Sequence, residues 1–520
     1  MRRRLLSLSL LTGAAFAALA TAAPRAEAFC GFYVGGAKSE MFNNATQVVL
    51  MRQGSTTVLS MQNNYQGPPE GFALIVPVPV VIRENQVKTL PRELFDKVDT
   101  LGAPRLVEYW EQDPCRPMYM EDRMYGVPAM SMESTDDAGA PAADYHVKIE
   151  AKFSVGEYDV VVLSAGESTG LDRWLRDNKY QIPKGAEPLL RPYVAAGTKF
   201  FVAKVNPKKV TFANGMATLS PLRFHYDSPE FTLPIRLGLA NSKGTQDLIV
   251  NILAPQRYEV ANYPNVAIPT NIVVRDSVRA HFAEFYAALF DQTVSKTKGA
   301  VVTEYSWDSG SCDPCPGPTL DSNDLATLGA DVMTDTYQNA NPYGVTLTRL
   351  HARYGKEVKD DLVFKAVTAL EGGRGMPDDK GAMSMAVTAD AGTNNFQGRY
   401  VILHPWTGAV TCESPVRGQW GGPPPQELAD PATVGARQPK AATNLAFAPR
   451  GSLNLTDAIA VDVPQVGLLS SGNATPLPRL RKGQGCACNT SLGAGAFGSA
   501  AGGAGLALFV LVVAGRRRRR

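Results

Sequence analysis

Alternating and continuous apolar runs near the start of the chain predict β-strands. Residues 48–61 and 72–81 are rich in Val, Leu, Ile and Met, and proline punctuates the second run. Residues 62–70 between them (Gln-Asn-Asn-Tyr-Gln-Gly-Pro-Pro-Glu) have the composition of a turn. We therefore expect the two runs to form paired strands. Residues 90–112 follow with partly helical spacing, which is interrupted at Gly102-Ala103-Pro104.

The middle of the chain mixes strand and helix patterns. Strands are expected over 146–153, 157–164, 199–206 and 248–253, and helices over 171–180 and 188–196. The clearest helical periodicity covers residues 277–298. Four apolar side chains recur there at a spacing of three or four residues: Val278, Phe282, Phe285 and Leu289. Asp276 or Ser277 can cap the N-terminus of this helix.

These elements predict an α+β fold with mainly antiparallel sheets and packed helices. Two stretches are predicted to be linkers from their composition. They are residues 129–144, rich in Ser, Ala and Met, and residues 418–450, rich in Pro, Gly and Ala. The expected parts are a signal peptide (1–28), an N-terminal β-rich unit (29–128), a linker (129–144), a second α+β unit (145–364), the C-terminal part of the body (365–417), a Pro/Gly-rich linker region (418–485) and a C-terminal sorting signal with a transmembrane segment and an Arg tail (486–520).

The first 28 residues have the three parts of a secretory signal peptide. Arg2, Arg3 and Arg4 form a basic start, residues 5–23 are apolar, and Ala26-Glu27-Ala28 is an A-x-A cleavage motif. We expect the export machinery to recognise this segment and cleavage to follow Ala28. An uncleaved membrane anchor is the alternative.

The C-terminal end combines a charge-free segment with a basic tail. Residues 492–515 carry no charged side chain, and five arginines, Arg516–Arg520, close the chain. As a helix this segment would span roughly 36 Å, enough to cross a hydrocarbon core of about 30 Å. The positive-inside rule would keep the arginines in the cytoplasm and the body outside.

The cysteines Cys486 and Cys488 lie just upstream, in the sequence Gly-Cys-Ala-Cys. A Cys among small residues, a short apolar helix and an Arg cluster, in that order, resemble the MYXO-CTERM sorting signal. The resemblance implies that a processing protease cuts near Cys486 or Cys488 and that the protein is displayed at the cell surface. The tail would then hold the chain in the membrane at least transiently. A permanent single-span anchor is the alternative.

Composition and charge exclude several classes of protein. The chain has 520 residues, 44% of them hydrophobic and 19% charged, as in an ordinary globular protein rather than a disordered, collagen-like or polytopic membrane protein. The formal net charge is +3. Without the nine arginines and one glutamate of residues 1–28 and 516–520, 43 basic and 48 acidic side chains remain, a net charge of −5. The body therefore lacks the basic balance of a nucleic-acid-binding protein.

Ser168 lies in the sequence Gly-Glu-Ser-Thr-Gly, which matches the G-x-S-x-G pattern of a nucleophile elbow. The motif falls between an expected strand and an expected helix, as an elbow requires. A catalytic histidine would have to come from His225, His281, His351 or His404. The surrounding chain lacks the repeated βα alternation of a hydrolase, however, and Thr169 with Asp172 forms a capping pair. We favour the structural interpretation and keep a serine hydrolase as an alternative.

Cys312 and Cys315 form a C-x-x-C motif. A redox dithiol needs a thiolate at a helix N-terminus, but Pro316-Gly317-Pro318 follows at once and disfavours a helix there. A zinc site would need a second ligand pair with matching spacing, which the sequence lacks. A structural disulfide is the main expectation in an oxidising compartment, and redox or metal chemistry are the alternatives.

The other cysteines of the expected mature body are Cys30, Cys115 and Cys412. Together with the C-x-x-C pair they make an odd number, so one is expected to stay free or to pair with Cys486 or Cys488. A Cys30–Cys115 bridge is one possibility, and it would stabilise the fold by roughly 4–5 kcal/mol. Sequence alone does not determine the connectivity.

Several motifs along the body resemble one family of bacterial proteins. They are residues 30–34 (Cys-Gly-Phe-Tyr-Val), 43–48, 62–67, 76–79, 106–111 (Leu-Val-Glu-Tyr-Trp-Glu), 158–165, 174–177, 312–316, 361–364 and, more weakly, 404–406 (His-Pro-Trp). They resemble the domain of unknown function 2330. The resemblance implies an exported envelope protein of unknown activity and assigns no catalytic residue.

These observations favour an exported, disulfide-stabilised protein of the cell envelope or surface with a non-enzymatic binding or structural role. We expect no cofactor, because no dinucleotide, P-loop or H-E-x-x-H motif is present. A serine hydrolase using Ser168 is the first alternative, and a thiol-disulfide protein using Cys312 and Cys315 is the second. The sequence identifies no ligand.

Overall fold

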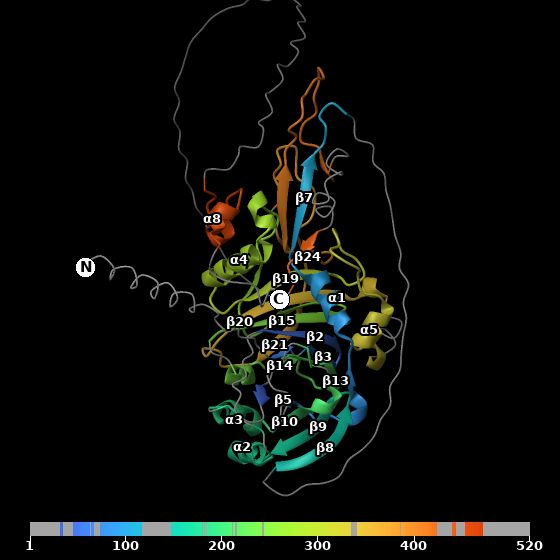
Figure 1. The fold of residues 1–520 in the computed structure, drawn as a ribbon, viewed down its shortest axis with the longest axis vertical. Coiled ribbons are helices and arrows are strands. Elements are labelled where there is room, and N and C mark those ends of the chain that lie inside the picture. Colours follow the sequence, from blue (N-terminus) through green and yellow to red (C-terminus); the bar gives the residue numbers. More distant parts are fainter. Residues whose placement is uncertain are drawn as a thin grey trace, which may run out of the picture. The chain divides into compact units, whose positions relative to one another are not determined.

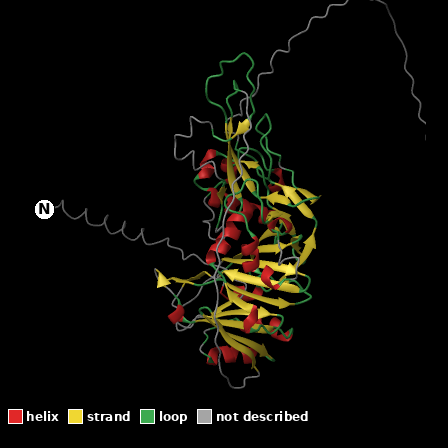
Figure 2. Ribbon diagram, turned by 90° about the vertical axis from the view of Figure 1, so that its right-hand side faces the viewer, coloured by secondary structure: helices red, strands yellow, loops and turns green. Residues whose placement is uncertain are grey.

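The computed structural model describes fifteen stretches of the chain (Figure 1): residues 32–34, 45–62, 64–66, 73–116, 147–178, 180, 182–183, 185–210, 212–213, 216–241, 244–333, 341–384, 386–423, 439–443 and 453–471. Within them the fold is α+β with mostly antiparallel sheets, as the sequence predicts. In Figure 2 the strands of the central sheet cross the body and helices pack alongside them.

The central sheet begins with a hairpin that differs from the prediction. Strands β2 (Ala45–Gln53) and β3 (Thr56–Gln62) pair with each other, so the apolar run 48–61 is two strands rather than one. The break falls at Gly54, whose φ of 55° suits a tight turn and is easy for glycine. The run 72–81 becomes β5 (Ala73–Val78), which pairs in another sheet with β1 (Phe32–Val34) and β10 (Lys199–Val205).

Strands β15 (Gln246–Ala254), β20 (Thr346–Tyr354) and β19 (Val301–Asp308) form the middle of the central sheet. Its order is β23-β22-β24-β19-β20-β15-β2-β3-β13-β6, and β17 pairs with β19 beside this path. The further strands are β6 (Val87–Thr89), β13 (Leu222–Asp227), β17 (Asn265–Ala267), β22 (Ala369–Gly372), β23 (Thr388–Ala391) and β24 (Asn395–Gln397). Pairing of β15 with β2 is parallel, whereas its pairing with β20 is antiparallel.

Side chains of β20 alternate between the two faces of the sheet, because successive residues of a strand point in opposite directions. Leu350, Ala352 and Tyr354 join the large apolar core shared with β2, β3 and β13. Arg349 and His351 lie on the other face and are equally buried. The sheet is therefore covered on both faces, and one of these faces is charged.

A second sheet has the order β1-β5-β10-β9-β8, and two helices pack on it. The strands β8 (Val147–Val155) and β9 (Tyr158–Ala165) and the helices α2 (Ser168–Asp177) and α3 (Glu187–Ala195) confirm four predicted elements to within three residues at each end. Leu171, Trp174 and Leu190 pack in the same apolar cluster as Val202 of β10.

A third sheet joins segments that are far apart in the sequence. Helix α1 (Arg92–Gly102) leads into β7 (Arg105–Glu111), so the second half of the expected helical stretch 90–112 is a strand. β7 pairs in parallel with β25 (Arg399–His404), and β25 pairs with β18 (Ile272–Val273). β26 (Trp420–Gly421) and β27 (Lys440–Ala441) also pair with β7. Figure 1 shows β7 running across the direction of β15 and β20.

The predicted helix 277–298 is present but starts later. Residues Asp276–Arg279 form the 3₁₀ turn η4, and α4 spans Phe282–Lys296 with His281 at its N-cap. The predicted stripe is buried: Val278, Phe282, Phe285 and Leu289 are at most 1% exposed. Burial of each large apolar side chain stabilises the fold by roughly 1.5–3 kcal/mol.

Part of the range 418–485, expected as a linker, packs on the body. The helix α8 (Leu455–Ala458) and the turn η9 (Pro464–Val466) contribute to the apolar cluster around α4. Arg275 donates a backbone hydrogen bond to Ala458 and a side-chain bond to Ser471. Residues 453–471 therefore belong to the folded body, and Figure 1 shows α8 next to α4.

The remaining elements are short. They are β4 (Asn64–Gln66), β11 (Phe212–Ala213), β12 (Met216–Thr218), β14 (Thr232–Leu233), β16 (Arg257–Val260), β21 (Leu362–Val367), α5 (Ser322–Leu328), η1 (Glu84–Gln86), η2 (Pro207–Lys209), η3 (Arg236–Asn241), η5 (Ala330–Val332) and η6 (Pro342–Gly344).

Strand pairing crosses the expected boundaries between units. β2 and β3 from the range 29–128 pair with β15 and β13 from the range 145–364. β7 from the first range pairs with β25 from the range 365–417. Among the described residues, no helix is long and apolar enough to cross a membrane. The expected signal peptide, the 129–144 linker and the C-terminal apolar segment lie outside the described residues.

Candidate functional site

The exposed end of the β7–β25 pair carries a group of charged side chains that we call the surface cluster: Glu108, Asp276, Arg279 and His404. Parallel pairing sets Glu108 opposite Ile402 and Trp110 opposite His404. The His404 Nε2 atom lies 2.7 Å from the Glu108 carboxylate. The indole ring of Trp110 stacks on the imidazole with 4.5 Å between ring centroids, and this contact fixes the plane of the imidazole.

Arg279 reaches into the surface cluster from the turn η4. Its Nε donates to Glu108 Oε1 at 2.8 Å, and its Nη2 donates to Glu108 Oε2 at 2.5 Å. The same Nη2 lies 2.7 Å from Asp276 Oδ1 and 3.4 Å from His404 Nε2. One guanidinium nitrogen thus contacts two carboxylates and an imidazole. The exposed fractions of the side chains range from 6% for Glu108 to 68% for Asp276.

The surface cluster keeps Glu108 ionised. Burial alone would raise the pKa of Glu108, but hydrogen bonds from His404 and Arg279 outweigh burial and lower it. Contact with Glu108 and Asp276 raises the pKa of Arg279 in turn. The arrangement places the imidazole of His404 next to a fixed carboxylate. It also provides three donor atoms of the kind that bind metal ions: a carboxylate oxygen each from Glu108 and Asp276 and a ring nitrogen from His404.

A disulfide lies beyond the end of β7. Cys115 is bonded to Cys412 across 297 residues of sequence, with 5.5 Å between their Cα atoms. The Glu111 carboxylate accepts two hydrogen bonds of 2.8 Å from Arg417 and further bonds from the backbone N–H groups of Trp406 and Gly418. Together these bonds fold the segment after β25 onto the end of β7.

The connectivity differs from the possibility raised by the sequence. Because Cys115 pairs with Cys412, it is not available to Cys30. The pairing follows from the β7–β25 contact, which brings residues 111 and 404 to the same end of one sheet. Cys30 lies outside the described residues, as do Ala28, Cys486 and Cys488. Their predicted roles in pairing and processing therefore stay predictions.

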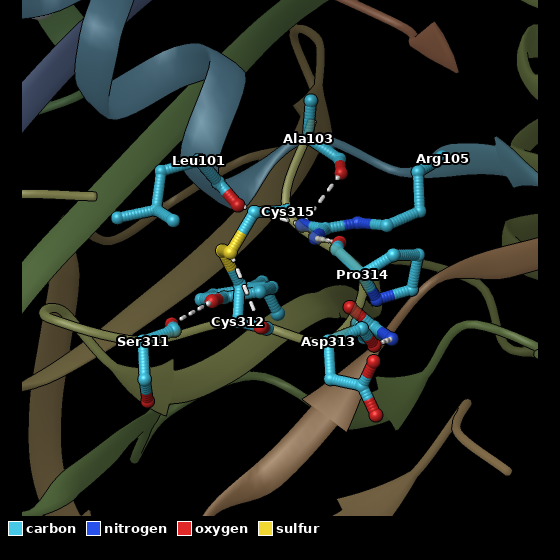
Figure 3. The surroundings of a disulfide bond; sticks show 10 residues. Leu101, Ala103, Arg105, Ser311, Cys312, Asp313, Pro314 and Cys315 are labelled. Atoms are coloured by element: carbon cyan, nitrogen blue, oxygen red, sulfur yellow. Dashed lines mark hydrogen bonds between the residues drawn. A yellow bond between two sulfur atoms is a disulfide. The ribbon is translucent and has the colours of Figure 1, made fainter. Parts of the chain in front are cut away.

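The second disulfide joins Cys312 and Cys315 in the segment between β19 and α5. Figure 3 shows that the Arg105 side chain lies against this segment and donates to the carbonyls of Leu101 and Pro314. α5 begins at Ser322, so no helix starts at the motif, as the prolines after Cys315 predict. The Pro314 carbonyl of this loop instead accepts a hydrogen bond from the buried Arg105 guanidinium.

Arg105 and Arg399 are cross-strand neighbours in the β7–β25 pair, and both are at most 1% exposed. Burial lowers the pKa of Arg105 to about 10 and also lowers that of Arg399. Arg399 donates to Asn271 Oδ1, to the Tyr109 hydroxyl and to the Gly375 carbonyl. Neutral oxygens therefore solvate both guanidinium groups, so their role is structural.

A second charged group, the buried network, lies between the central sheet and the helices α1 and α4. It comprises Asp99, Asp247, Tyr286, Asp291, Glu304, Arg349, His351 and Arg353. Glu304 sits at a β-bulge of β19, where the register with β20 shifts. Its carboxylate accepts bonds of 2.7 Å from each of three side chains: Tyr286, Arg349 and His351.

His351 bridges two carboxylates of the buried network. Its Nδ1 lies 2.7 Å from Glu304, and its Nε2 lies 3.0 Å from Asp247. The imidazole also stacks on Phe290 of α4 with 3.8 Å between ring centroids. Arg353 continues the network by binding Asp247 at 3.0 Å and Asp291 of α4.

Electrostatics favour the charged forms of Glu304 and His351 in the buried network. Burial alone would raise the pKa of Glu304, but His351 and Arg349 outweigh burial and lower it to about 2. Burial alone would lower the pKa of His351, but Glu304 and Asp247 raise it. The side chains of Glu304 and Arg349 are 0% exposed, so no substrate reaches these groups. We therefore interpret the network as the attachment of α4 to the sheet.

Ser168 is the first residue of α2. Its hydroxyl donates to Glu187 of α3 at 2.6 Å, whereas an elbow serine would donate to an imidazole. The helix begins three residues before the predicted start, and its N-cap residue is Glu167, which makes no side-chain capping bond. Thr169 is therefore not the cap. The Ser168–Glu187 bond instead joins the starts of two neighbouring helices.

Sequence reasoning missed both charged groups. Glu108 and His404 fall in motifs that the sequence analysis singled out, 106–111 and 404–406, but nothing local joins these two motifs. A signal for the buried network was present in β19, where Glu304 interrupts the strand pattern Val-Val-Thr-Glu-Tyr-Ser-Trp. A lone carboxylate within such a strand needs buried partners.

Comparison with known proteins gives one family match. The family model described as "Uncharacterized protein conserved in bacteria (DUF2330)" matches residues 24–365. No curated protein and no solved structure matches the chain. The match includes β7 and the buried network. It ends before β25, so both His404 and Cys412 lie outside the matched residues.

Proposed function

We propose an exported, non-enzymatic role in the cell envelope or at the cell surface for this protein, which belongs to the DUF2330 family of uncharacterised bacterial proteins. Its function would be binding or structural, on a body stabilised by disulfides. Support comes from the N-terminal and C-terminal sequence patterns and from the cysteine pairing in the described body.

The Cys115–Cys412 disulfide is the observation that carries this proposal. Disulfides persist in oxidising compartments such as the periplasm or the cell surface and are rare in the cytosol. This one joins segments 297 residues apart and reinforces the contact between β7 and the segment after β25. A long-range structural bridge of this kind is typical of exported proteins.

The state of the candidate catalytic groups supports a non-enzymatic role. Ser168 is bonded to Glu187, and His351 is held between Glu304 and Asp247 inside the fold. Each of these contacts has a structural explanation. A serine-reactive phosphonate tests the hydrolase alternative, because labelling that is lost in Ser168→Ala would contradict our proposal.

Intact mass of protein extracted from the envelope tests the proposal directly. We expect a mass that begins at Phe29 and ends near Cys486 or Cys488. We also expect that alkylation without prior reduction leaves Cys115, Cys312, Cys315 and Cys412 unmodified. A cytosolic protein with an intact N-terminus and alkylated cysteines would overturn it. A chain that extends to Arg520 would replace surface processing by a plain membrane anchor.

A thiol-disulfide function is the second candidate, because the Cys315 side of the C-x-x-C disulfide is exposed. Such a function predicts turnover of a disulfide substrate in the presence of a thiol reductant. That turnover would be lost in Cys312→Ser, whereas Cys115→Ser would serve as the matched control. We favour a structural disulfide, because the motif does not begin a helix and the Pro314 carbonyl within it binds Arg105.

A further inference from the structure

We propose that Glu108, Asp276 and His404 form a site for a divalent transition-metal ion, best matched by Zn²⁺, for which the Arg279 guanidinium is a built-in competitor. This inference goes beyond the proposed envelope role and does not depend on it. It rests on the surface cluster described above.

The donor set suits zinc. One imidazole and two carboxylates are common zinc ligands, and an imidazole favours Zn²⁺, Cu²⁺ or Ni²⁺ over Mg²⁺ or Ca²⁺. One donor atom from each of Glu108, Asp276 and His404 lies within 4.8 Å of the other two. Around a tetrahedral zinc with bonds of about 2.0–2.1 Å, donor atoms lie roughly 3.4 Å apart. The Glu108–His404 pair, 2.7 Å apart, would open by roughly 0.7 Å, and a donor pair at the 4.8 Å limit would close by roughly 1.4 Å. Side-chain rotation can supply shifts of this size.

The position of Arg279 is the second observation that points to a cation. Its Nη2 lies 2.5 Å from Glu108 Oε2, 2.7 Å from Asp276 Oδ1 and 3.4 Å from His404 Nε2. A positively charged atom therefore already sits among all three donors. A metal ion would take the place of this nitrogen.

Arg279 can be displaced because it approaches from the solvent side. Its side chain is 43% exposed and that of Asp276 is 68% exposed, and both belong to the 3₁₀ turn η4. Glu108 and His404 belong instead to paired strands and are 6% and 24% exposed. The site thus has two donors fixed on the sheet, while the third donor and the competing cation lie on an exposed turn.

The charge balance agrees with this exchange. With a neutral imidazole, the two carboxylates and Arg279 sum to one negative charge, and without Arg279 they sum to two. A Zn²⁺ ion that displaces the guanidinium would neutralise the donors. Lys440 donates to the carbonyl of Arg279 rather than to a donor of the site. Stacking on Trp110 holds the imidazole plane for either cation.

Zinc titration of the untagged protein in competition with a chromophoric chelator tests the proposal. Alkylation before titration blocks any free thiol. We expect Arg279→Ala to bind one Zn²⁺ at least tenfold more tightly than the wild type, because the internal competitor is gone. Arg279→Ala combined with His404→Gln should lose that binding.

Arg176→Ala is the matched control. Arg176 forms a comparable pair with Asp172, with its Nε 2.7 Å and its Nη2 3.0 Å from the carboxylate, but has no histidine in the pair. The zinc affinity of the Arg176→Ala variant should equal that of the wild type. Circular dichroism and an intact Cys115–Cys412 disulfide would show that each variant is folded.

Three results would overturn the proposal. In the first, Arg279→Ala binds zinc no more tightly than the wild type. In the second, neither the wild type nor Arg279→Ala binds zinc. In the third, the double variant with Arg279→Ala and His404→Gln retains the ion. The last result would place the ion elsewhere on the chain. None of these results bears on export, which the intact-mass experiment tests separately.

Discussion

The buried network and the surface cluster are built from the same groups but differ in their access to water. In each, a glutamate binds a histidine at 2.7 Å, and the imidazole stacks on an aromatic ring. In each, an arginine Nε donates to the same glutamate, at 2.7 Å for Glu304 and 2.8 Å for Glu108. The exposure of the glutamate is 0% in the first case and 6% in the second.

The difference in solvent access gives the two arginines different roles. Arg349 has no exposed surface, so its charge must remain paired as long as the protein is folded. Arg279 is 43% exposed, so water can replace its partners at little cost. The same three groups therefore act as a permanent internal attachment in one place and as an exchangeable surface site in the other.

Removing Glu304 is the change with the largest expected effect. Glu304→Ala leaves His351 and Arg349 charged and the Tyr286 hydroxyl without its acceptor, so we expect a loss of about 3–5 kcal/mol in the free energy of unfolding. Urea denaturation followed by tryptophan fluorescence would measure it. Glu108→Ala is the control and should cost much less. Equal losses would mean that burial does not separate the two groups.

The Cys115–Cys412 disulfide should have the next largest effect. Cys115→Ser together with Cys412→Ser removes a long cross-link, and we expect a loss of about 2–4 kcal/mol in the free energy of unfolding. Thermal denaturation of the oxidised wild type and the double variant would show it. Reduction should lower the stability of the wild type and leave that of the double variant nearly unchanged. An unchanged melting temperature in the double variant would mean that hydrogen bonds alone hold the segment on β7.

The pH dependence of stability should distinguish the two histidine environments. The folded pKa of His351 is raised, so its protonation stabilises the fold below about pH 6.5, the unfolded pKa. That contribution is lost as the pH rises through the folded pKa. It amounts to about 1.4 kcal/mol for each pH unit that separates the folded pKa from the unfolded pKa. His351→Gln should flatten the unfolding free energy as the pH rises above about 6.5, relative to wild type, because no His351 titrates in this variant. An unchanged slope in this variant would assign the effect to another group.

Arg279→Ala without added metal should have the smallest effect. Its ion pairs are solvent-exposed, so we expect a change within about 1 kcal/mol in the free energy of unfolding. The same urea titration would measure it, with Arg176→Ala as the reference for an exposed arginine. A loss as large as that of Glu304→Ala would show that the surface cluster is part of the fold's internal support.

Local patterns predicted the elements whose stability is local. The apolar stripe of Phe282, Phe285 and Leu289 was sufficient for α4, and β-branched runs were sufficient for β8 and β9. The predicted start of α4 was wrong, because Asp276 pairs with Arg279 in a 3₁₀ turn and does not cap the helix. The hairpin at Gly54 was missed because only Gly54 and Ser55 separate its two strands.

Non-local pairing could not be predicted in the same way. The partner of Cys115 depends on the pairing of β7 with β25, whose residues are separated by nearly 300 positions. The contact between Glu108 and His404 has the same origin. Each side chain was visible in a motif, but only the sheet register makes them neighbours. One sequence contains no signal for that register.

The pairing of β7 with β25 also limits what counts as an independent piece of this protein. The family match ends at residue 365, whereas β25 begins at Arg399. A recombinant fragment that stops at the family boundary would expose the backbone hydrogen-bonding groups of β7 along a whole edge and would lose the bridge to Cys115. We therefore regard the matched segment as an evolutionary unit that is not a folding unit. Relatives that share only this segment would need a different strand, or a binding partner, to cover the same edge.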